Sequence, residues 1–329
     1  MLEVPTTPKR VVVIQYRWCI QSYTRDLIYY LSDHGYLVTL FIDKASLEHG
    51  VINSEKLRNS NVDIIELCDQ SSQNVTLWDR LKSRAKREVL ARLSNPLSLL
   101  DGSDFEFVSL WMQTHRDETI AIIGIEKLGL IFAGAIADKY SVPYIYYSLE
   151  LYFRELSDAS IFQQQVAFEC MYHKGAIATL IQDEFRGEAL FKHNIVSSQP
   201  KIFIPIGVPT LPKAESSSYW HRKFDLPEDS RIFLYFGTLA LRPRCLDALI
   251  DAWAGCPAAY VLVLHGVGDP AEIREFCEQR RLRNVFVSAD VVPEEQIREL
   301  VASADVGICI YKNTTVNERL TAFSSHIEL

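Results

Sequence analysis

Predicted strands and helices alternate along both halves of this 329-residue chain. In the first half, short apolar runs predict strands at 10–16, 36–42, 62–67, 119–124, 142–147, 176–182 and 201–204, with helices at 23–31, 76–93, 128–140, 158–173 and 183–191. The second half repeats the pattern, with strands near 231–236, 259–264, 284–288 and 305–311 and helices near 244–254, 271–281 and 294–303. Such alternation predicts an α/β fold with two parallel, doubly wound sheets.

A proline-rich stretch separates the two halves. Pro205, Pro209 and Pro212 fall close together and are followed by three serines at 216–218. Proline neither continues a helix nor donates a hydrogen bond within a central strand, so this stretch is a linker. The chain is also too long for one comfortable core. We therefore expect two Rossmann-like domains, at 1–205 and 206–329.

Composition limits the classes of partner. The net charge of −8 gives no reason to expect a nucleic-acid partner. Seven scattered cysteines without a Cys-x-x-Cys pair are typical of reduced thiols. The chain shows no signal peptide and no apolar run of membrane-spanning length, so the expected location is the cytoplasm.

The segment 76–93 is predicted to be a basic amphipathic helix. Its apolar stripe includes Leu77, Leu81 and Val89, and six lysines and arginines supply the charge. Most such helices pack the stripe on a sheet and leave the charges in water, which is the favoured interpretation. The alternative is a peripheral contact with anionic lipid headgroups.

Several catalytic signatures are missing from the sequence. It contains no phosphate loop, no His-Glu-x-x-His, no Gly-x-Ser-x-Gly and no Asp-x-Asp pair. The first strand is not followed by a Gly-x-Gly-x-x-Gly fingerprint either. These absences argue against metal-dependent and serine-nucleophile chemistries. We expect neither a metal nor a cofactor.

The turn that begins at Gly266 is a loose dinucleotide motif. Gly266-Val267-Gly268-Asp269-Pro270-Ala271 matches Gly-x-Gly-x-x-Ala, and Asp290 follows about twenty residues later, where an acid would bind ribose. However, the turn follows the second strand of its domain and not the first. A tight structural turn is the favoured interpretation, with dinucleotide binding as the alternative.

The loop after the strand at 231–236 has the residues of an anion site. Gly237 and Thr238 allow a close approach of the backbone to a ligand, and Arg242 or Arg244 could hold a phosphate. Arg244 lies at a predicted helix start, where a cation gains nothing from the helix dipole. That placement slightly favours a ligand role.

The last residues, 324–328, have two interpretations. Ser324, Ser325 and the free N–H groups of a helix start can face an anion, and Glu328, one turn further on, can accept the hydroxyls of a ribose. Equally, Ser325 and Glu328 have the spacing of a simple capping box. The residues alone leave both open.

Taken together, these residues resemble the nucleotide-sugar glycosyltransferases of the GT-B fold, nearest to glycosyltransferase family 4. The resemblance is carried by the turn at 236–239 with Arg244 and the helix at 249–253, and by the segments 264–268, 300–307, 324–328, 145–151 and 181–186. It implies that the second domain binds a nucleoside-diphosphate sugar. Glu328 would hold the ribose, Ser324, Ser325 and Arg244 would contact the diphosphate, and Gly237 and Thr238 would line the cleft.

The resemblance also implies an acceptor site on the first domain. Its candidates are Arg17, Glu126 and Glu150, of which Glu126 and Glu150 lie just beyond predicted strand ends. Arg244 and Glu150 are the expected catalytic residues. Sugar transfer would retain the anomeric configuration and need no metal, and the acceptor would be a saccharide, a lipid-linked molecule or another small molecule.

Two alternatives remain at this stage. The family continues beyond the ribose glutamate, so the chain is expected to be C-terminally truncated, and Leu320 occupies the position of a glutamate that touches the donor sugar. Both features favour a non-catalytic binding protein of the same fold. The second alternative, an NAD-dependent dehydrogenase, rests on the Gly266 turn alone.

Overall fold

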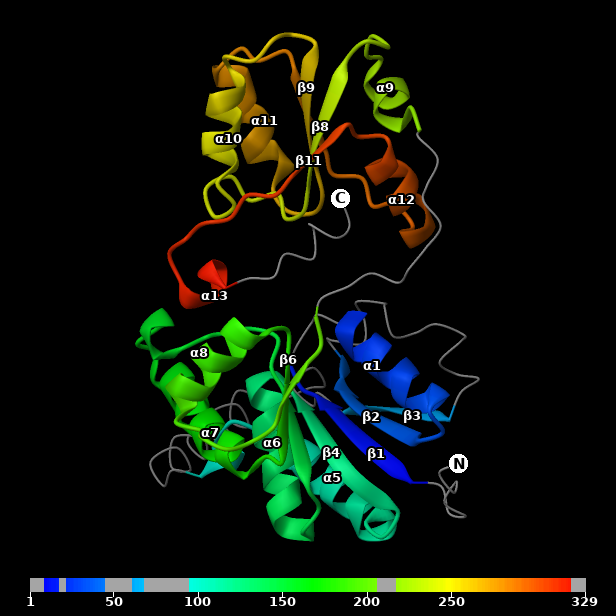
Figure 1. Cartoon of the computed structure of the whole chain (residues 1–329), viewed down its shortest axis with the longest axis vertical. Coiled ribbons are helices and arrows are strands. Elements are labelled where there is room, and N and C mark those ends of the chain that lie inside the picture. Colours follow the sequence, from blue (N-terminus) through cyan, green and yellow to red (C-terminus); the bar gives the residue numbers. More distant parts are fainter. Residues whose placement is uncertain (1–8, 18–21, 45–60, 68–94, 206–216, 321–329) are drawn as a thin grey trace, which may run out of the picture. The chain divides into compact units, whose positions relative to one another are not determined.

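The computed structural model describes residues 9–17, 22–44, 61–67, 95–205 and 217–320 (Figure 1). The chain divides into two compact units, Met1–Ile204 and Pro205–Leu329. They are called here the N-terminal unit and the C-terminal unit, and each is described by itself. The predicted basic helix at 76–93 lies outside the described residues.

The N-terminal unit is built on one parallel sheet. Its described strands follow the order β3-β2-β1-β4-β5-β6-β7, and every neighbouring pair is parallel. The strands are β1 (Arg10–Gln15), β2 (Leu37–Asp43), β3 (Val62–Leu67), β4 (Thr119–Ile125), β5 (Tyr144–Tyr147), β6 (Ala178–Ile181) and β7 (Lys201–Phe203). The sequence predicted all seven, and the doubly wound α/β architecture is confirmed.

Helices connect these strands. They are α1 (Ser22–Asp33), α5 (Gly102–His115), α6 (Glu126–Tyr140), α7 (Ser160–Gly175) and α8 (Glu184–Asn194), with short 3-10 turns η2 (Pro96–Ser98) and η3 (Arg154–Leu156). The helix α5 was not predicted, because its apolar side chains do not form one stripe: Val108 and Met112 are buried, whereas Phe107 and Leu110 are exposed. Among the described helices, none is long and apolar enough to cross a membrane.

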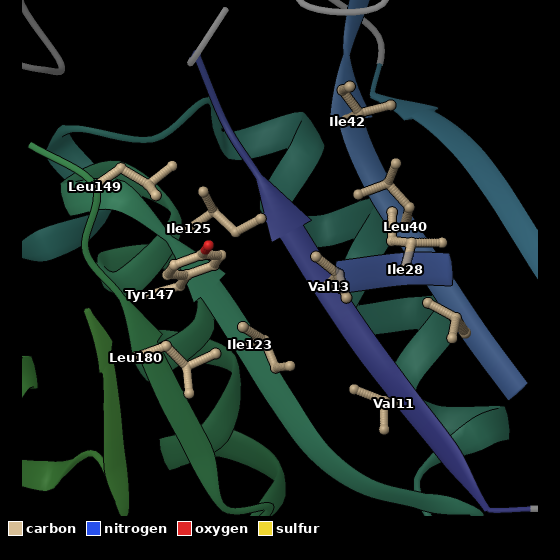
Figure 2. Packing of buried hydrophobic residues seen from close by; sticks show 11 residues of the cluster. Val11, Val13, Ile28, Leu40, Ile42, Ile123, Ile125, Tyr147, Leu149 and Leu180 are labelled. Atoms are coloured by element: carbon tan, nitrogen blue, oxygen red, sulfur yellow. The ribbon is translucent and has the colours of Figure 1, made fainter. Parts of the chain in front are cut away.

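A buried cluster covers the face of this sheet that carries α1. Val11 and Val13 of β1 pack with Leu40 and Ile42 of β2, and Ile28 of α1 lies against them (Figure 2). On the β4 and β5 side the cluster continues through Ile123, Ile125, Tyr147, Leu149 and Leu180. The alternation of side chains along each strand sends the residues between these to the other face, where α6 packs. The sheet is therefore covered on both faces, as parallel sheets require.

The C-terminal unit repeats the arrangement with a smaller sheet. Its described strands have the order β10-β9-β8-β11, all parallel: β8 (Arg231–Phe236), β9 (Tyr260–His265), β10 (Val285–Ser288) and β11 (Val306–Ile308). The helices are α9 (Tyr219–Phe224), α10 (Leu246–Trp253), α11 (Pro270–Gln279), α12 (Glu294–Ala302) and α13 (Val316–Arg319).

Two cores cover the two faces of the smaller sheet. On one face, Leu262 and Leu264 pack with Ile250 of α10 and Ile273 of α11. On the other, strand residues pack with Trp220 of α9 and Leu300 of α12, and the buried indole Nε1 of Trp220 donates to the Leu300 carbonyl at 3.0 Å. Figure 1 shows α10 and α11 on one side of this sheet and α9 and α12 on the other. The helix α9 was not predicted from sequence.

The strand β11 is shorter than the predicted range of 305–311. Asp305 precedes it and sets its register, because the Asp305 carboxylate accepts the Ile232 N–H at 2.7 Å and pairs with Arg231 at 2.7 Å. Pairing with β8 ends where Ile308 lies opposite Tyr235. The chain then leaves the sheet, which frees 309–315 to form a loop at the carboxyl end of the strands.

Candidate functional site

Each sheet has one point where the strand order reverses. In the N-terminal unit this topological switch point lies between β1 and β4, and in the C-terminal unit it lies between β8 and β11. In open α/β sheets, ligands bind at the carboxyl ends of the strands beside such points. Residues that bind a ligand are therefore expected in the loops that follow β1, β4, β8 and β11.

Arg17 lies two residues after β1 and Glu126 directly follows β4, the two strands that flank the switch point of the N-terminal unit. Both adopt left-handed backbone conformations, with φ of 53° and 60°. Residues with a β-carbon rarely take this conformation, and such strain concentrates at functional sites. The fold thus places two of the predicted acceptor-side residues at neighbouring strand ends.

The loop that starts at Arg17 is tied to the neighbouring strand β2. The Arg17 N–H donates to the carboxylate of Asp43, the last residue of β2, at 2.6 Å. The Arg17 side chain is exposed, and its guanidinium lies over the Tyr16 ring, 5.1 Å from the centroid. Arg17 therefore presents a positive charge at the carboxyl edge of the sheet.

Glu126 is buried, with 4% of its surface exposed. One of its carboxylate oxygens, Oε1, accepts the N–H groups of Leu149 at 2.5 Å and Glu150 at 2.8 Å. Burial raises the pKa of Glu126 to about 7, against the opposing effects of Lys127 and of the two N–H donors. The first residue of α6 thereby holds the loop after β5.

Two further residues hold the same loop, and the sequence did not single them out as site residues. The buried Arg186 donates from Nη2 to the Leu149 carbonyl at 2.6 Å, and Gln182 donates to the same oxygen at 2.8 Å. Arg186 Nε also donates to Gln182 Oε1 at 2.9 Å. In the sequence, both lie in the segment 181–186, one of those that carry the resemblance to GT-B glycosyltransferases. Glu150 itself is half-buried beside this group.

A buried ion pair lies in the elements beneath this edge. Lys127 of α6 and Glu169 of α7 are 2.7 Å apart and almost fully buried. Tyr146 of β5 donates to the other oxygen of Glu169 at 2.8 Å. A buried ion pair requires such additional hydrogen bonds to offset the loss of hydration. The pair ties α6, α7 and β5 together below Glu126.

In the C-terminal unit, the loop after β8 is joined to the turn after β9. Gly237 N–H donates to the His265 carbonyl at 3.0 Å, Leu239 N–H to the Val267 carbonyl at 2.7 Å, and Asp269 N–H to the Leu239 carbonyl at 2.8 Å. These backbone bonds extend the pairing of β8 and β9 beyond the strands. The two predicted ligand loops, 237–239 and 265–269, therefore form one continuous hydrogen-bonded surface, the ledge.

The glycines of the turn permit this contact. Gly266 and Gly268 have φ of 149° and 144°, and a β-carbon on Gly266 would lie 1.7 Å from the Gly237 carbonyl oxygen. Only glycine fits where two backbones approach so closely. This contact explains the Gly-x-Gly pattern as a structural turn. Asp290, the acid of the dinucleotide alternative, forms an ion pair with Lys223 of α9.

Thr238 is an exposed polar residue of the ledge, and Arg242 and the half-buried Arg244 follow it in the same loop. Among the described residues, the N–H and hydroxyl of Thr238 have no hydrogen-bond partner. Arg242 is exposed. The Arg244 guanidinium lies over the Tyr311 ring, 5.2 Å from the centroid. Because Tyr311 follows β11, this contact spans the switch point between β8 and β11.

The loop after β11 is ordered by Glu318. Its carboxylate accepts the N–H groups of Thr314 and Thr315, both at 2.9 Å, and forms a capping box with Thr315 at the start of α13. These bonds, led by the one from the Thr314 hydroxyl, lower the pKa of Glu318. Ser324, Ser325 and Glu328 lie outside the described residues, so their roles stay predictions.

In the part of the chain that the structure describes, no group of three or more histidine, cysteine, aspartate or glutamate side chains is arranged to hold a metal ion. The expected metal independence stays a prediction.

No protein-family model matches the chain, and no curated protein matches its sequence. Solved structures do resemble it. Sucrose-phosphate synthase from Thermosynechococcus elongatus superposes with a TM-score of 0.63 at 16% identity, over 91% of this chain and 74% of that one. HepE from Anabaena, solved in complex with UDP, gives a TM-score of 0.59 at 16% identity, over 91% and 73% of the two chains.

WaaG, a glycosyltransferase involved in lipopolysaccharide biosynthesis, gives a TM-score of 0.56 at 15% identity and covers 91% of this chain and 74% of its own. HepE has also been solved in complex with UDP-glucose. At these identities the likeness establishes the fold. The chain has the two-unit GT-B fold of these proteins, which confirms the predicted fold class.

Proposed function

We propose that this chain is a glycosyltransferase that moves a sugar from a nucleoside-diphosphate sugar to an acceptor. The observation that carries the proposal is the Arg244–Tyr311 contact across the switch point of the C-terminal unit, in a GT-B fold. The same loop after β8 carries Thr238, whose N–H and hydroxyl have no hydrogen-bond partner among the described residues. A diphosphate is the ligand that such a group fits best.

In this proposal the C-terminal unit binds the donor. Arg244 and Thr238 contact the diphosphate, Gly237 lines the site, and the predicted partners Ser324, Ser325 and Glu328 complete it, with Glu328 on the ribose. Uridine nucleotides are the first donors to test, because HepE was solved with UDP and UDP-glucose. The nearest family is family 4, on the resemblance of the sequence.

The N-terminal unit binds the acceptor, with Arg17, Glu126 and Glu150 at the carboxyl edge of its sheet. The proposed acceptor is a saccharide, a lipid-linked molecule or another small molecule, and the segment 76–93 is the candidate for a peripheral membrane contact. We further propose that transfer retains the anomeric configuration.

The chemical step then depends on departure of the diphosphate. As the bond from the sugar to the diphosphate lengthens, negative charge grows on the leaving oxygen. In this proposal Arg244 and the Thr238 donors stabilise this charge, as preorganised cations and N–H groups do at a developing oxyanion. Glu150, held at the edge of the N-terminal unit, is the proposed carboxylate on the acceptor side. No metal is needed in this scheme.

A binding screen followed by a turnover assay tests the proposal. UDP, GDP and ADP are titrated by calorimetry, and the protein is then incubated with the labelled glucose esters of the nucleotide that binds. Binding with transfer, or with slow hydrolysis of the donor, supports the proposal. Binding without turnover supports the non-catalytic alternative, and binding of NADH in place of all three nucleotides supports the dehydrogenase.

A further inference from the structure

One peptide unit of the N-terminal unit is held on both of its polar sides. The C=O of Leu149 and the N–H of Glu150 belong to the same peptide. The N–H donates to Glu126 at 2.8 Å, and the C=O accepts from Arg186 at 2.6 Å and from Gln182 at 2.8 Å. A carboxylate and a guanidinium thus act on opposite ends of one peptide dipole, and both bonds are charge-assisted.

The side chain of Leu149 fixes this peptide from a third direction. It is buried with Ile125 and Tyr147 in the core cluster of the sheet (Figure 2). A slide of the loop along the sheet would therefore expose apolar surface as well as break hydrogen bonds. The main chain of Glu150 is consequently fixed, while its own side chain is half-buried at the surface.

Glu126, Arg186 and Gln182, with the Leu149–Glu150 peptide that they hold, are called the clamp, and two features of Glu126 lower the stability of the folded chain. Glu126 is 4% exposed and has a left-handed φ of 60°, and both features are unfavourable for a glutamate. Its oxygen Oε1 makes both bonds, and Oε2 has no hydrogen-bond partner among the described residues. The one buried group of this side chain therefore serves the loop after β5, whose two N–H donors it accepts.

We infer that Glu126 is a positioning residue which, together with Arg186, fixes the main chain of Glu150 and so sets the place of the Glu150 carboxylate at the carboxyl edge of the N-terminal sheet. Glu126 acts through the peptide and does not touch the substrate. Its contribution to turnover rests on the proposed function, whereas the clamp is a property of the folded chain alone.

The charge of the clamp changes near neutral pH. Burial raises the pKa of Glu126 to about 7, and the groups that face it are Lys127 on α6, Glu150 after β5, Tyr146 and Tyr147 on β5 and Arg186 on α8. A protonated carboxyl accepts hydrogen bonds more weakly than a carboxylate. The hold on the Glu150 N–H therefore weakens as the pH falls through this value.

Amide resonances test the clamp without any substrate. The protein is labelled with ¹⁵N-leucine and ¹⁵N-glutamate, and amide proton shifts are followed from about pH 5.5 to about pH 8.5, which brackets the pKa of Glu126. In the native protein, the Leu149 and Glu150 amides are expected to shift together with one midpoint near 7. In Glu126→Gln these titrations should vanish. The matched control is Glu184→Gln, which removes an exposed charge from the first turn of α8 and should titrate like the native protein.

Two results would overturn the clamp. One is a pair of Leu149 and Glu150 amides that do not titrate in the native protein. The other is a titration that persists unchanged in Glu126→Gln, because the carboxylate would then not be the group responsible.

A kinetic measurement tests the consequence for turnover. With UDP-glucose as the probe, Glu126→Gln should lower kcat at least about tenfold, the loss expected from one charge-assisted hydrogen bond, and leave the donor KM nearly unchanged. The kcat of the native protein should fall below pH 7, and that dependence should be lost in the variant. A rise in KM with unchanged kcat would contradict the positioning role. Absence of turnover in the native protein would instead count against the proposed function and leave the amide result standing.

Discussion

The guanidinium of Arg244 lies 5.2 Å above the ring of Tyr311, and this contact joins the loops after β8 and β11 across the reversal in strand order. The two residues are far apart in sequence, and each follows a strand that the sequence predicted. A cation over an aromatic ring is attracted by the ring's electrons, so the contact with Tyr311 helps to hold the Arg244 guanidinium at this place.

Replacing Arg244 with alanine should therefore weaken nucleotide binding. The loss of one or two charge-assisted hydrogen bonds to the diphosphate, each worth ~1.5–3 kcal/mol, lowers affinity at least about tenfold. Calorimetry with UDP measures the change. Arg283→Ala is the matched control, because Arg283 is exposed and precedes β10 at the opposite edge of the same sheet. If both variants bind UDP with equal affinity, Arg244 does not contact the nucleotide.

Glu328→Ala tests the predicted ribose contact. The carboxylate should accept two ribose hydroxyls, so its removal should reduce donor affinity by at least about tenfold. Comparison of UDP with its 2′-deoxy analogue sharpens the measurement, because the native protein should distinguish them and the variant should not. If Glu328 serves only as the partner of Ser325 in a capping box, both nucleotides will bind the variant as they bind the native protein.

The stability of the N-terminal unit should depend on pH through Glu126. The folded pKa of about 7 lies above the unfolded value of 4.5, so the folded state holds this proton more tightly. The stabilising contribution is complete below about pH 4.5 and is lost as the pH rises through 7, by about 3 kcal/mol at most, since one pKa unit corresponds to about 1.4 kcal/mol.

This dependence must be separated from that of His173. Burial lowers the pKa of His173 to about 4, so its contribution is lost as the pH falls below the usual value of 6.5. The difference in unfolding free energy between the native protein and Glu126→Gln cancels the histidine. That difference, measured by urea denaturation from about pH 5 to about pH 8, should decrease steadily. A constant difference would show that Glu126 does not change its charge in this range.

The glycine turn after β9 should tolerate no side chain. Gly266→Ala places a β-carbon 1.7 Å from the Gly237 carbonyl oxygen at a φ of 149°, so we expect a loss of about 3 kcal/mol or more in the stability of the C-terminal unit. Gly255→Ala is the control, because nothing lies within 4 Å of its added carbon. Thermal unfolding distinguishes the two. If Gly266→Ala is as stable as the control, the loops after β8 and β9 can move apart without lowering the stability of the C-terminal unit.

The sequence was sufficient to locate the strands and the edge of each sheet at which the candidate residues lie. Strands such as β3 and β8 have strong local patterns, and their predicted bounds, 62–67 and 231–236, agree with the structure. A parallel topology then places every loop that follows a strand at one edge. That is why Arg17, Glu126 and Gly237 could be selected as site candidates before their surroundings were known.

The partners of these residues could not be predicted, because they depend on tertiary contacts. The Glu126 carboxylate meets the Leu149 N–H 23 positions later, and Arg186 meets the Leu149 carbonyl from 37 positions away. No periodicity or motif records such pairs. The helix α5 was missed for a local reason, because two of its large apolar residues, Phe107 and Leu110, face solvent and break the expected stripe.

The way in which Glu150 is held has a consequence for variation. Glu126, Arg186 and Gln182 all form hydrogen bonds with the backbone of its loop, and the Arg186 charge also acts on the Glu150 carboxylate. A substitution at position 150 therefore changes the functional group at the edge and leaves the hydrogen bonds to its backbone in place. The position is suited to evolutionary change and to engineering: Glu150→Gln, Glu150→Asp and Glu150→His should each fold as the native chain does and present a different chemical group to an acceptor from the same point in space.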